Sequence, residues 1–173
     1  MAFTIDLLRK QLSAIEPNEA TYAEIGPSEI TLLQQLLKDP EPWMSARAIF
    51  ALSRIGDETA VATIRKAIAD PRPEVRVAIA ASAANLTAKD SDIVLAEVLD
   101  DKDIGVRKFA VQSISVKNDP RILAKLQSIE AQDPVSLMRD HARLKRRELE
   151  NKPTPIPPVK VNPFMKLDPR IKK

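Results

Sequence analysis

Apolar residues recur at helical spacing along most of this chain, and prolines or glycines interrupt the pattern at regular distances. A spacing of i, i+3, i+4 and i+7 predicts amphipathic helices. Such segments follow one another as four pairs between residues 28 and 150, and a further one covers residues 4–15. We therefore expect an overwhelmingly helical chain with almost no strand.

The apolar pattern of residues 4–15, before the first pair, predicts a helix that caps the array. Thr4 is its expected N-cap, Pro17 follows its end, and its apolar face comprises Ile5, Leu8, Leu12 and Ile15. Residues 17–27 predict a helical turn and a link that Gly26 and Pro27 close. Ser28 is the expected N-cap of the first pair. We assign residues 1–27 to this capping helix and link.

The four pairs are copies of one pattern. An aspartate recurs at an almost constant interval in the turn inside each pair, at Asp39, Asp70, Asp101 and Asp133. Apolar residues follow at two fixed offsets, first Met44, Val75, Val106 and Met138, then Ala48, Ile79, Ala110 and Ala142. An arginine column runs beside the first of these, with Arg76, Arg107 and Arg139; Ser45 breaks it in the first unit, where Arg47 is the nearest arginine.

A fixed period of this length is typical of stacked two-helix units. The last helix, over about residues 136–150, is strongly charged and places Arg146 where earlier units have Leu52, Ala83 and Ile114. It therefore has the composition of a terminal unit. The predicted fold is an all-α, right-handed α-solenoid of about four helical pairs over residues 28–150, followed by an extended tail.

Residues 151–173 form that tail. They hold six of the fourteen prolines and show no helical or strand period, which favours an extended backbone. Apolar residues nevertheless recur among basic ones, which is the composition of a peptide that binds something. The candidate anchors are Lys160, Phe164, Met165, Leu167 and Arg170. The sequence leaves open whether they dock on a partner or on the array.

The charge divides unevenly along the chain. Residues 1–138 carry 16 Lys and Arg against 20 Asp and Glu, whereas residues 139–173 carry 11 against 4. The basic stretch 139–147, with candidate contacts Arg143, Arg146 and Arg147, could bind phosphates or be a solvated helix face. We do not favour nucleic acid as the partner, because the body is acidic.

No catalytic constellation emerges from the composition. There is no cysteine and a single histidine, His141, for which a surface position is expected, and three glycines cannot build a phosphate loop. Asp100, Asp101 and Asp103 lack the spacing of a calcium loop and are expected to be a solvated turn. We expect no cofactor, no metal, no enzyme activity and no membrane span, and a cytoplasmic location. Trp43, at a turn, either anchors a partner or packs against neighbouring prolines.

The repeat resembles the short bacterial-type HEAT-like repeats. The resemblance is carried by DPRPEVRVAI, DKDIGVRKFA and DPVSLMRDHA, with a partial match in DPEPWMSARA, and covers about residues 28–146. It implies that the turn aspartates and column arginines form a ladder between units, made of Asp70, Arg76, Asp101, Arg107, Asp133 and Arg139. The competing interpretation of this column is a phosphate-binding ladder, but each arginine has a turn aspartate within reach.

These features predict a scaffold or assembly adaptor that binds a protein partner on its open helical face and with its tail. Similar repeats occur in phycobilin lyases, so a lyase-like or chaperone role that handles a chromophore or apoprotein is one alternative. Binding of nucleic acid through the basic C-terminal region is the other. The sequence does not identify the partner.

Overall fold

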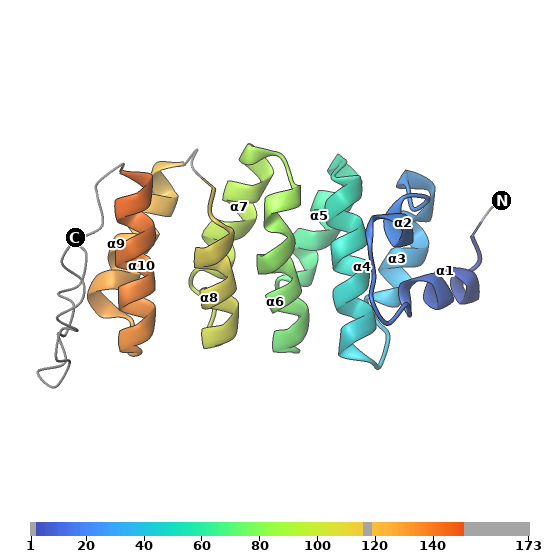
Figure 1. The fold of residues 1–173 in the computed structure, drawn as a ribbon, viewed down its shortest axis with the longest axis horizontal. Coiled ribbons are helices and arrows are strands. Elements are labelled where there is room, and N and C mark those ends of the chain that lie inside the picture. The colour runs from blue at the N-terminus through green and yellow to red at the C-terminus, as the bar shows by residue number, and fades with distance from the viewer. Residues whose placement is uncertain (1–2, 116–118, 151–173) are drawn as a thin grey trace, which may run out of the picture.

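The computed structural model describes residues 3–115 and 119–150, and within them the chain consists of helices and turns without a strand (Figure 1). The prediction of an all-α fold is confirmed. The helices of the described part are α1 (Ile5–Leu12), α2 (Glu19–Tyr22), α3 (Ile30–Leu36), α4 (Pro42–Ile55), α5 (Glu58–Ala67), α6 (Pro73–Ser82), α7 (Ala88–Val98), α8 (Ile104–Ser113), α9 (Pro120–Gln132) and α10 (Ser136–Leu149). Two short 3-10 helices, η1 (Pro27–Glu29) and η2 (Ala83–Asn85), precede α3 and follow α6.

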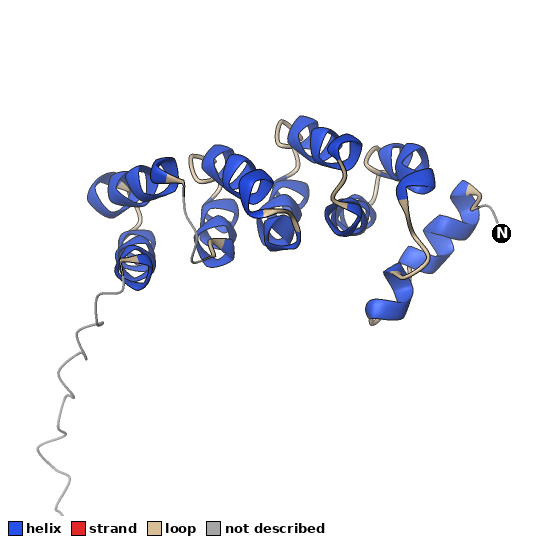
Figure 2. Cartoon of the chain, turned by 90° about the horizontal axis from the view of Figure 1, so that it is seen from above, coloured by secondary structure: helices blue, strands red, loops and turns tan. Residues whose placement is uncertain are grey.

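Helices α3 to α10 form four pairs that stack into an α-solenoid. The second helices of the pairs lie side by side, with α4 against α6, α6 against α8, and α8 against α10. Figure 2 shows them as one layer of a curved array, with the first helices in the other layer on the outside of the curve. The second helices therefore line the inner face, and α1 packs against α3 and α4 at one end.

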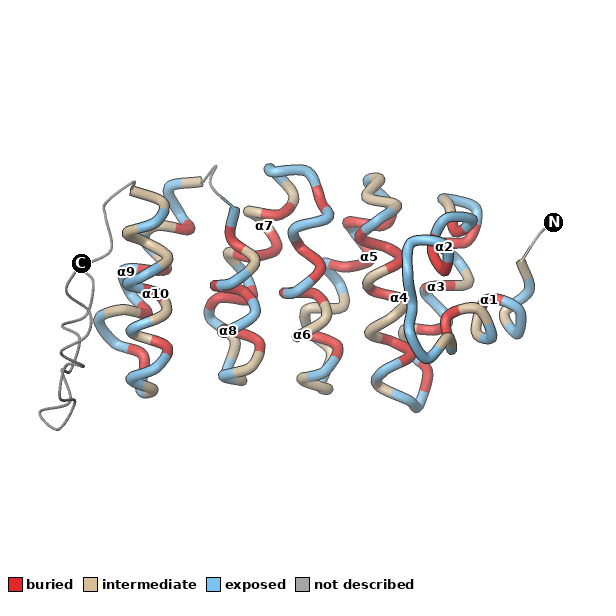
Figure 3. The backbone as a smooth tube through the Cα atoms, in the orientation of Figure 1, coloured by how far each residue is buried: buried red, intermediate tan, exposed pale blue. Residues whose placement is uncertain are grey.

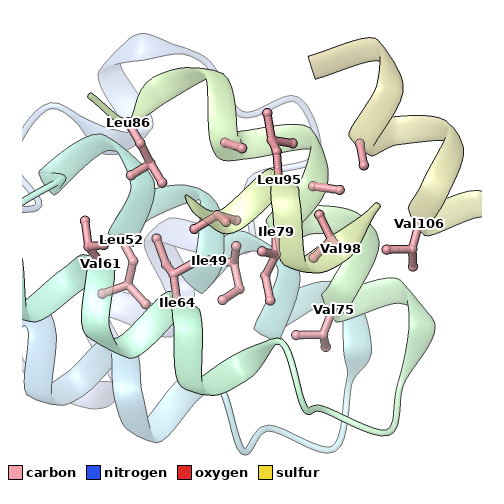
Figure 4. Close-up of a cluster of buried hydrophobic side chains, with 14 of the residues drawn as sticks. Ile49, Leu52, Val61, Ile64, Val75, Ile79, Leu86, Leu95, Val98 and Val106 are labelled. Atoms are coloured by element: carbon pink, nitrogen blue, oxygen red, sulfur yellow. The ribbon is translucent and has the colours of Figure 1, made fainter. Parts of the chain in front are cut away.

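The core lies between the two layers, and buried residues occur along every helix of the four pairs (Figure 3). The two apolar columns that follow each turn are fully buried in all four units, including Met44, Val106 and Ala142. Figure 4 shows side chains of neighbouring pairs in one cluster there, with Ile49 and Leu52 of the first pair beside Ile64 and Ile79 of the second. Alanines in the second column let adjacent helices approach closely, because a small side chain leaves the groove between ridges open.

Prolines and a glycine set the helix ends as the pattern predicts. Pro42, Pro73 and Pro120 stand in the first turns of α4, α6 and α9, where the missing N–H group has no partner to lose. Gly56 ends α4 with φ of 62°, a left-handed conformation that a glycine adopts without strain. Thr4 caps α1 by accepting a hydrogen bond from the Leu7 N–H at 3.3 Å.

Two details of the N-terminal region differ from the prediction. Helix α1 ends at Leu12, and Ile15 lies beyond it with 95% of its surface exposed instead of joining the apolar face. The Ser13 hydroxyl donates to the Arg9 carbonyl at 2.7 Å, a local bond that competes with helix continuation, and Pro17 disfavours helical backbone before it. Ser28 is not an N-cap either. The 3-10 helix η1 begins one residue earlier, because Pro27 has its φ preset for a helix start.

Candidate functional site

Arg76 on α6 joins two successive units. Its Nε and Nη2 atoms donate to both carboxylate oxygens of Asp101, at 2.6 and 3.0 Å. Its Nη1 atom donates to the carbonyl oxygens of Asp70 and Pro71, at 2.8 and 3.1 Å. The guanidinium therefore lies between the turn of its own unit and the aspartate of the next unit. It donates hydrogen bonds to the acceptors of both.

Arg107 on α8 makes the same connection one unit later. Nε and Nη2 donate to the carboxylate of Asp133 at 2.8 and 3.1 Å, and Nη1 donates to the carbonyls of Asp101 and Lys102. Only 11% of the Arg107 side chain and 4% of the Asp133 side chain are exposed. A buried bidentate ion pair of this kind is strong and geometrically specific, so it fixes the orientation of the two turns relative to each other.

The rung between the first and second units is built differently. Ser45 holds the arginine position of the column, and its hydroxyl donates to the Leu36 and Leu37 carbonyls. Arg72, in the turn of the second unit, supplies the guanidinium from the other side. It pairs with Asp70 of its own turn through both carboxylate oxygens and donates to the Leu37 and Asp39 carbonyls at 2.7 Å each. The sequence analysis missed this residue, although Arg72 directly follows an Asp-Pro turn opposite the serine.

The two ends of the ladder differ from each other. At the N-terminal end, Arg9 of α1 pairs with Asp39, so the cap supplies the arginine that no preceding unit provides. At the C-terminal end, Arg139 of α10 donates through Nη1 to the Asp133 carbonyl at 2.6 Å, as inner arginines do to their own turns. Among the described residues, no carboxylate pairs with its Nε and Nη2 atoms. Each of the four turn aspartates is thus paired with an arginine. Arg139, the last arginine of the column, has no aspartate partner within the described part.

The geometry of the column does not support its use as a phosphate ladder. Arg76 and Arg107 are buried, and their donor groups are occupied by carboxylates and carbonyls. To bind either arginine, an anion from solution would have to displace the aspartate that already forms a bidentate pair with it. These residues act in the array as connections between units.

The carboxylates of the ladder, such as Asp70 and Asp101, should make the free energy of unfolding depend on pH in the acid range. Burial raises the pKa of Asp101, but hydrogen bonds from Arg76 and from the Asp103 N–H outweigh it and leave the pKa below its usual value. For Asp70, the hydrogen bond from Arg72 is the main cause of a lowered pKa. A group with a lowered pKa stabilises the fold above the pKa of the unfolded chain, about 3.9, and loses that contribution as pH falls through the folded pKa.

We therefore expect the free energy of unfolding to hold down to about pH 5 and to fall below about pH 4. Denaturant unfolding at pH 7, 4 and 3 measures this. The Asp101→Asn variant should be less stable than wild type at pH 7, and the difference should shrink toward pH 3. Asp140→Asn, which removes an exposed carboxylate, is the control and should differ little at any pH. A constant difference for Asp101→Asn would contradict the expectation.

Large exposed apolar side chains gather on one layer of the array. Within residues 28–115 and 119–150, all of them lie on second helices and none on α3, α5, α7 or α9: Trp43 on α4, Ile104 and Phe109 on α8, and Leu137 and Leu144 on α10. Between 39% and 53% of each of these residues is exposed. Trp43, Phe109 and Leu144 stand at positions that turn away from the core, so we call the set of five the inner-face residues.

Trp43 is held in place without being covered. Its indole N–H donates to the Glu41 carboxylate at 3.2 Å, and the Arg47 guanidinium lies 5.9 Å from the ring centre. Arg47 is itself positioned by a hydrogen bond to the Ala14 carbonyl at 2.8 Å. A tryptophan that two neighbouring side chains hold and that is still 43% exposed has the properties of an interface anchor.

The terminal helix carries arginines at positions that inner units bury. Arg143 stands where Ile49, Ala80 and Val111 face their neighbours, and it pairs with Asp140. Arg146 donates to Glu130 of α9 at 2.8 Å and to Glu150 at 3.0 Å. The hydrogen bond from Arg146 is the main cause of the lowered pKa of Glu130. Arg147 is half-buried and has no hydrogen bond or ion pair within the described residues.

His141 lies closer to the array than a surface position implies. It lines a small cleft of about 240 Å³ between α8 and α10 together with Val111 and Leu144. Its Nδ1 atom is buried and has no hydrogen-bond partner among the described residues. The other lining residues are Gln112, Lys145 and Glu148, and Lys145 pairs with Glu148 at 2.9 Å, so the cleft has the composition of a contact between two helices.

The acidic cluster in the third turn is used by the fold. Asp101 holds Arg76, Asp100 pairs with Lys125, and Asp103 caps α8 by accepting from the Gly105 and Val106 N–H groups. In the part of the chain that the structure describes, no group of three acidic or histidine side chains is arranged to hold a metal ion. The same residues include no helix long and apolar enough to span a membrane. The tail candidates Lys160, Phe164, Met165, Leu167 and Arg170 lie outside the described residues.

The stacked pairs, the inner face and the aspartate–arginine ladder define an α-solenoid. Residues 30–115 match the family model of HEAT repeats, and the chain belongs to the HEAT-like repeat family. The resemblance seen in the sequence is therefore confirmed. HEAT repeats generally mediate protein–protein interaction. No curated protein matches the chain at a significant level.

Proposed function

We propose that this protein is a non-enzymatic scaffold or assembly adaptor that binds a protein partner on its inner face. The observation that carries the proposal is the segregation of the exposed apolar side chains. In the repeats, the exposed large apolar residues of the described part all lie on second helices. These helices form the layer on the inside of the curve (Figure 2). Exposed apolar surface that is gathered on one face, with polar residues elsewhere, marks an interaction site.

The mechanism is burial of surface on a rigid, preformed platform. The ladder and the buried columns hold the second helices in fixed positions relative to one another. The inner face therefore loses little conformational entropy when a partner binds. Trp43 at one end and Leu137 and Leu144 at the other are the strongest candidate anchors, with Phe109 between them. The role of the tail residues in binding stays a prediction, because they lie outside the described part.

The proposal is tested by substituting two inner-face residues, Trp43→Ala with Phe109→Ala, in chains used to capture partners from the native organism. We expect affinity for the captured protein to fall at least tenfold, since truncating interface anchors costs more than about 1.4 kcal/mol. Leu7→Ser is the matched control, because Leu7 on α1 is equally exposed but lies outside the second helices. Circular dichroism confirms that each variant is folded. Equal affinities for wild type and the double variant would exclude the inner face.

A further inference from the structure

The ladder is incomplete at its C-terminal end. In the inner units, one edge of each column arginine donates to carbonyls of its own turn and the other edge, Nε with Nη2, holds the aspartate of the following unit. Arg139 makes the first contact, with the Asp133 carbonyl, and has no carboxylate on the second edge among the described residues. A site of known chemistry, for an aspartate in an Asp-Pro turn, is thus formed on α10.

The C-terminal segment contains the matching motif. Asp168-Pro169 repeats the dipeptide Asp133-Pro134, whose aspartate Arg107 holds, and Asp168 is the single acidic residue of 151–173. Arg170 follows it as Arg72 follows Asp70-Pro71. Arg72 bonds to Asp70 of its own turn where Ser45 holds the column position, whereas Arg139 holds that position here. Phe164 and Met165 precede Asp168 by four and three residues, the offsets at which Ile129 and Val98 precede Asp133 and Asp101 in the core. The match therefore includes the residues before the turn.

The chain length between helix and turn also matches. Residues 83–100 separate α6 from Asp101, and residues 114–132 separate α8 from Asp133. Residues 150–167, a segment as long as 83–100, separate α10 from Asp168. Even without a helix there, this length reaches back along α10, since a helix of 14 residues spans only about 21 Å and extended chain covers about 3.3 Å per residue.

We propose that the Asp168-Pro169 turn docks on Arg139 as a fifth rung of the ladder, so that the C-terminal segment of this chain covers the end of its own array. Asp168 accepts from the open edge of Arg139 as Asp133 accepts from Arg107. The tether makes the contact intramolecular, with an effective concentration on the order of millimolar.

The charges around Arg139 permit the contact although the segment is basic. Arg143 and Arg146, its neighbours on α10, are already paired with Asp140 and Glu130. The local field that opposes the lysines of the segment is thereby reduced. Because Arg139 has further cations near it on α10 and the segment is itself basic, we expect this rung to open more readily than the buried Arg107–Asp133 pair, which leaves the segment free to exchange onto a partner.

The test uses the absence of cysteine from the chain. A nitroxide attached at Ile171→Cys in the full-length protein broadens amide resonances that lie near it. We expect broadening to be concentrated on residues 133–140 at the end of the array. It should be lost when Asp168→Asn or Arg139→Gln is added, and retained with Arg147→Gln, which removes a cation of the same helix that is outside the ladder column.

The remaining outcomes overturn the proposal. Broadening that Asp168→Asn leaves unchanged means that the segment contacts the array by other means, and no local broadening means that it does not dock. A mixture of spin-labelled chain with isotope-labelled, cysteine-free chain identifies the occupant. Broadening of residues 133–140 in that mixture means that a second copy supplies the aspartate, contrary to the proposal.

Discussion

Replacing Arg107 with alanine is expected to lower the free energy of unfolding by about 3 kcal/mol. The substitution leaves the Asp133 carboxylate buried with only the Val135 N–H at 2.9 Å as a remaining donor, and it removes the donor to two turn carbonyls. Breaking a buried pair by removing one partner costs more than the pair contributes, because the other charge stays out of water. In a chain of this size, about 3 kcal/mol corresponds to a melting temperature lower by about 6–12 °C.

Arg143→Ala is the matched comparison, since it removes an arginine from an exposed pair on α10. Pairs of that kind contribute only about 0–1 kcal/mol. Arg107→Lys should fall between wild type and Arg107→Ala, because an ammonium keeps the charge but cannot donate in a fork to Asp133 and to two carbonyls. Thermal and denaturant unfolding measure all three variants. Equal losses for Arg107→Ala and Arg143→Ala would show that the ladder does not hold the units together.

The second large effect is expected at Arg72. Arg72→Ala removes the two side-chain hydrogen bonds to Asp70 and the donors to the Leu37 and Asp39 carbonyls, whereas the bond from the backbone N–H of residue 72 to Asp70 remains. We expect a loss of about 2 kcal/mol, within the range for hydrogen bonds to charged groups, with a quarter of the Arg72 side chain in contact with solvent. The loss should exceed that from Arg65→Ala, which removes an exposed pair with Glu97 on the outer layer.

A rescue distinguishes the ladder from a merely local contact. Adding Ser45→Arg to Arg72→Ala places a guanidinium at the column position that Arg76 and Arg107 hold in later units. If the site between two turns is what matters, the double variant should recover about half of the lost stability, measured by denaturant unfolding. A double variant no more stable than Arg72→Ala would indicate that Arg72 acts only within its own turn.

The regular part of this fold was readable from the sequence because each unit repeats the same physical constraints. The columns headed by Met44 and Ala48 recur with an invariant offset from the turn, and every copy must fill the same space between two neighbours. Once Val75 and Ile79 are assigned to the core in DPRPEVRVAI, the residues at the same offsets in the other units are assigned to it as well. The positions of Arg76 and Arg107 followed from the same register, and the structure adds that each also donates to carbonyls of its own turn.

The irregular parts depend on contacts that no period encodes. Arg72 fills a site that Ser45 vacates, and Arg9 reaches Asp39 from a helix outside the repeat. Ile15 was placed on an apolar face by spacing alone, whereas Ser13 ends the helix first. Likewise, its place at a turn marked Trp43 as a candidate, but the segregation of the exposed apolar residues of the repeats onto one layer required knowledge of which helices lie inside the curve.

The ladder gives the array a direction. Every unit offers an aspartate toward its N-terminal side, and the second, third and fourth units carry a column arginine on the C-terminal side, so the two ends of the stack are complementary rather than alike. Free ends of this kind would join copies head to tail into an open filament, since nothing in the geometry closes the series. Arg9 prevents this at one end by occupying Asp39 from within the chain. The capping helix thus covers the core and also occupies the aspartate that the last arginine of a second copy would otherwise meet.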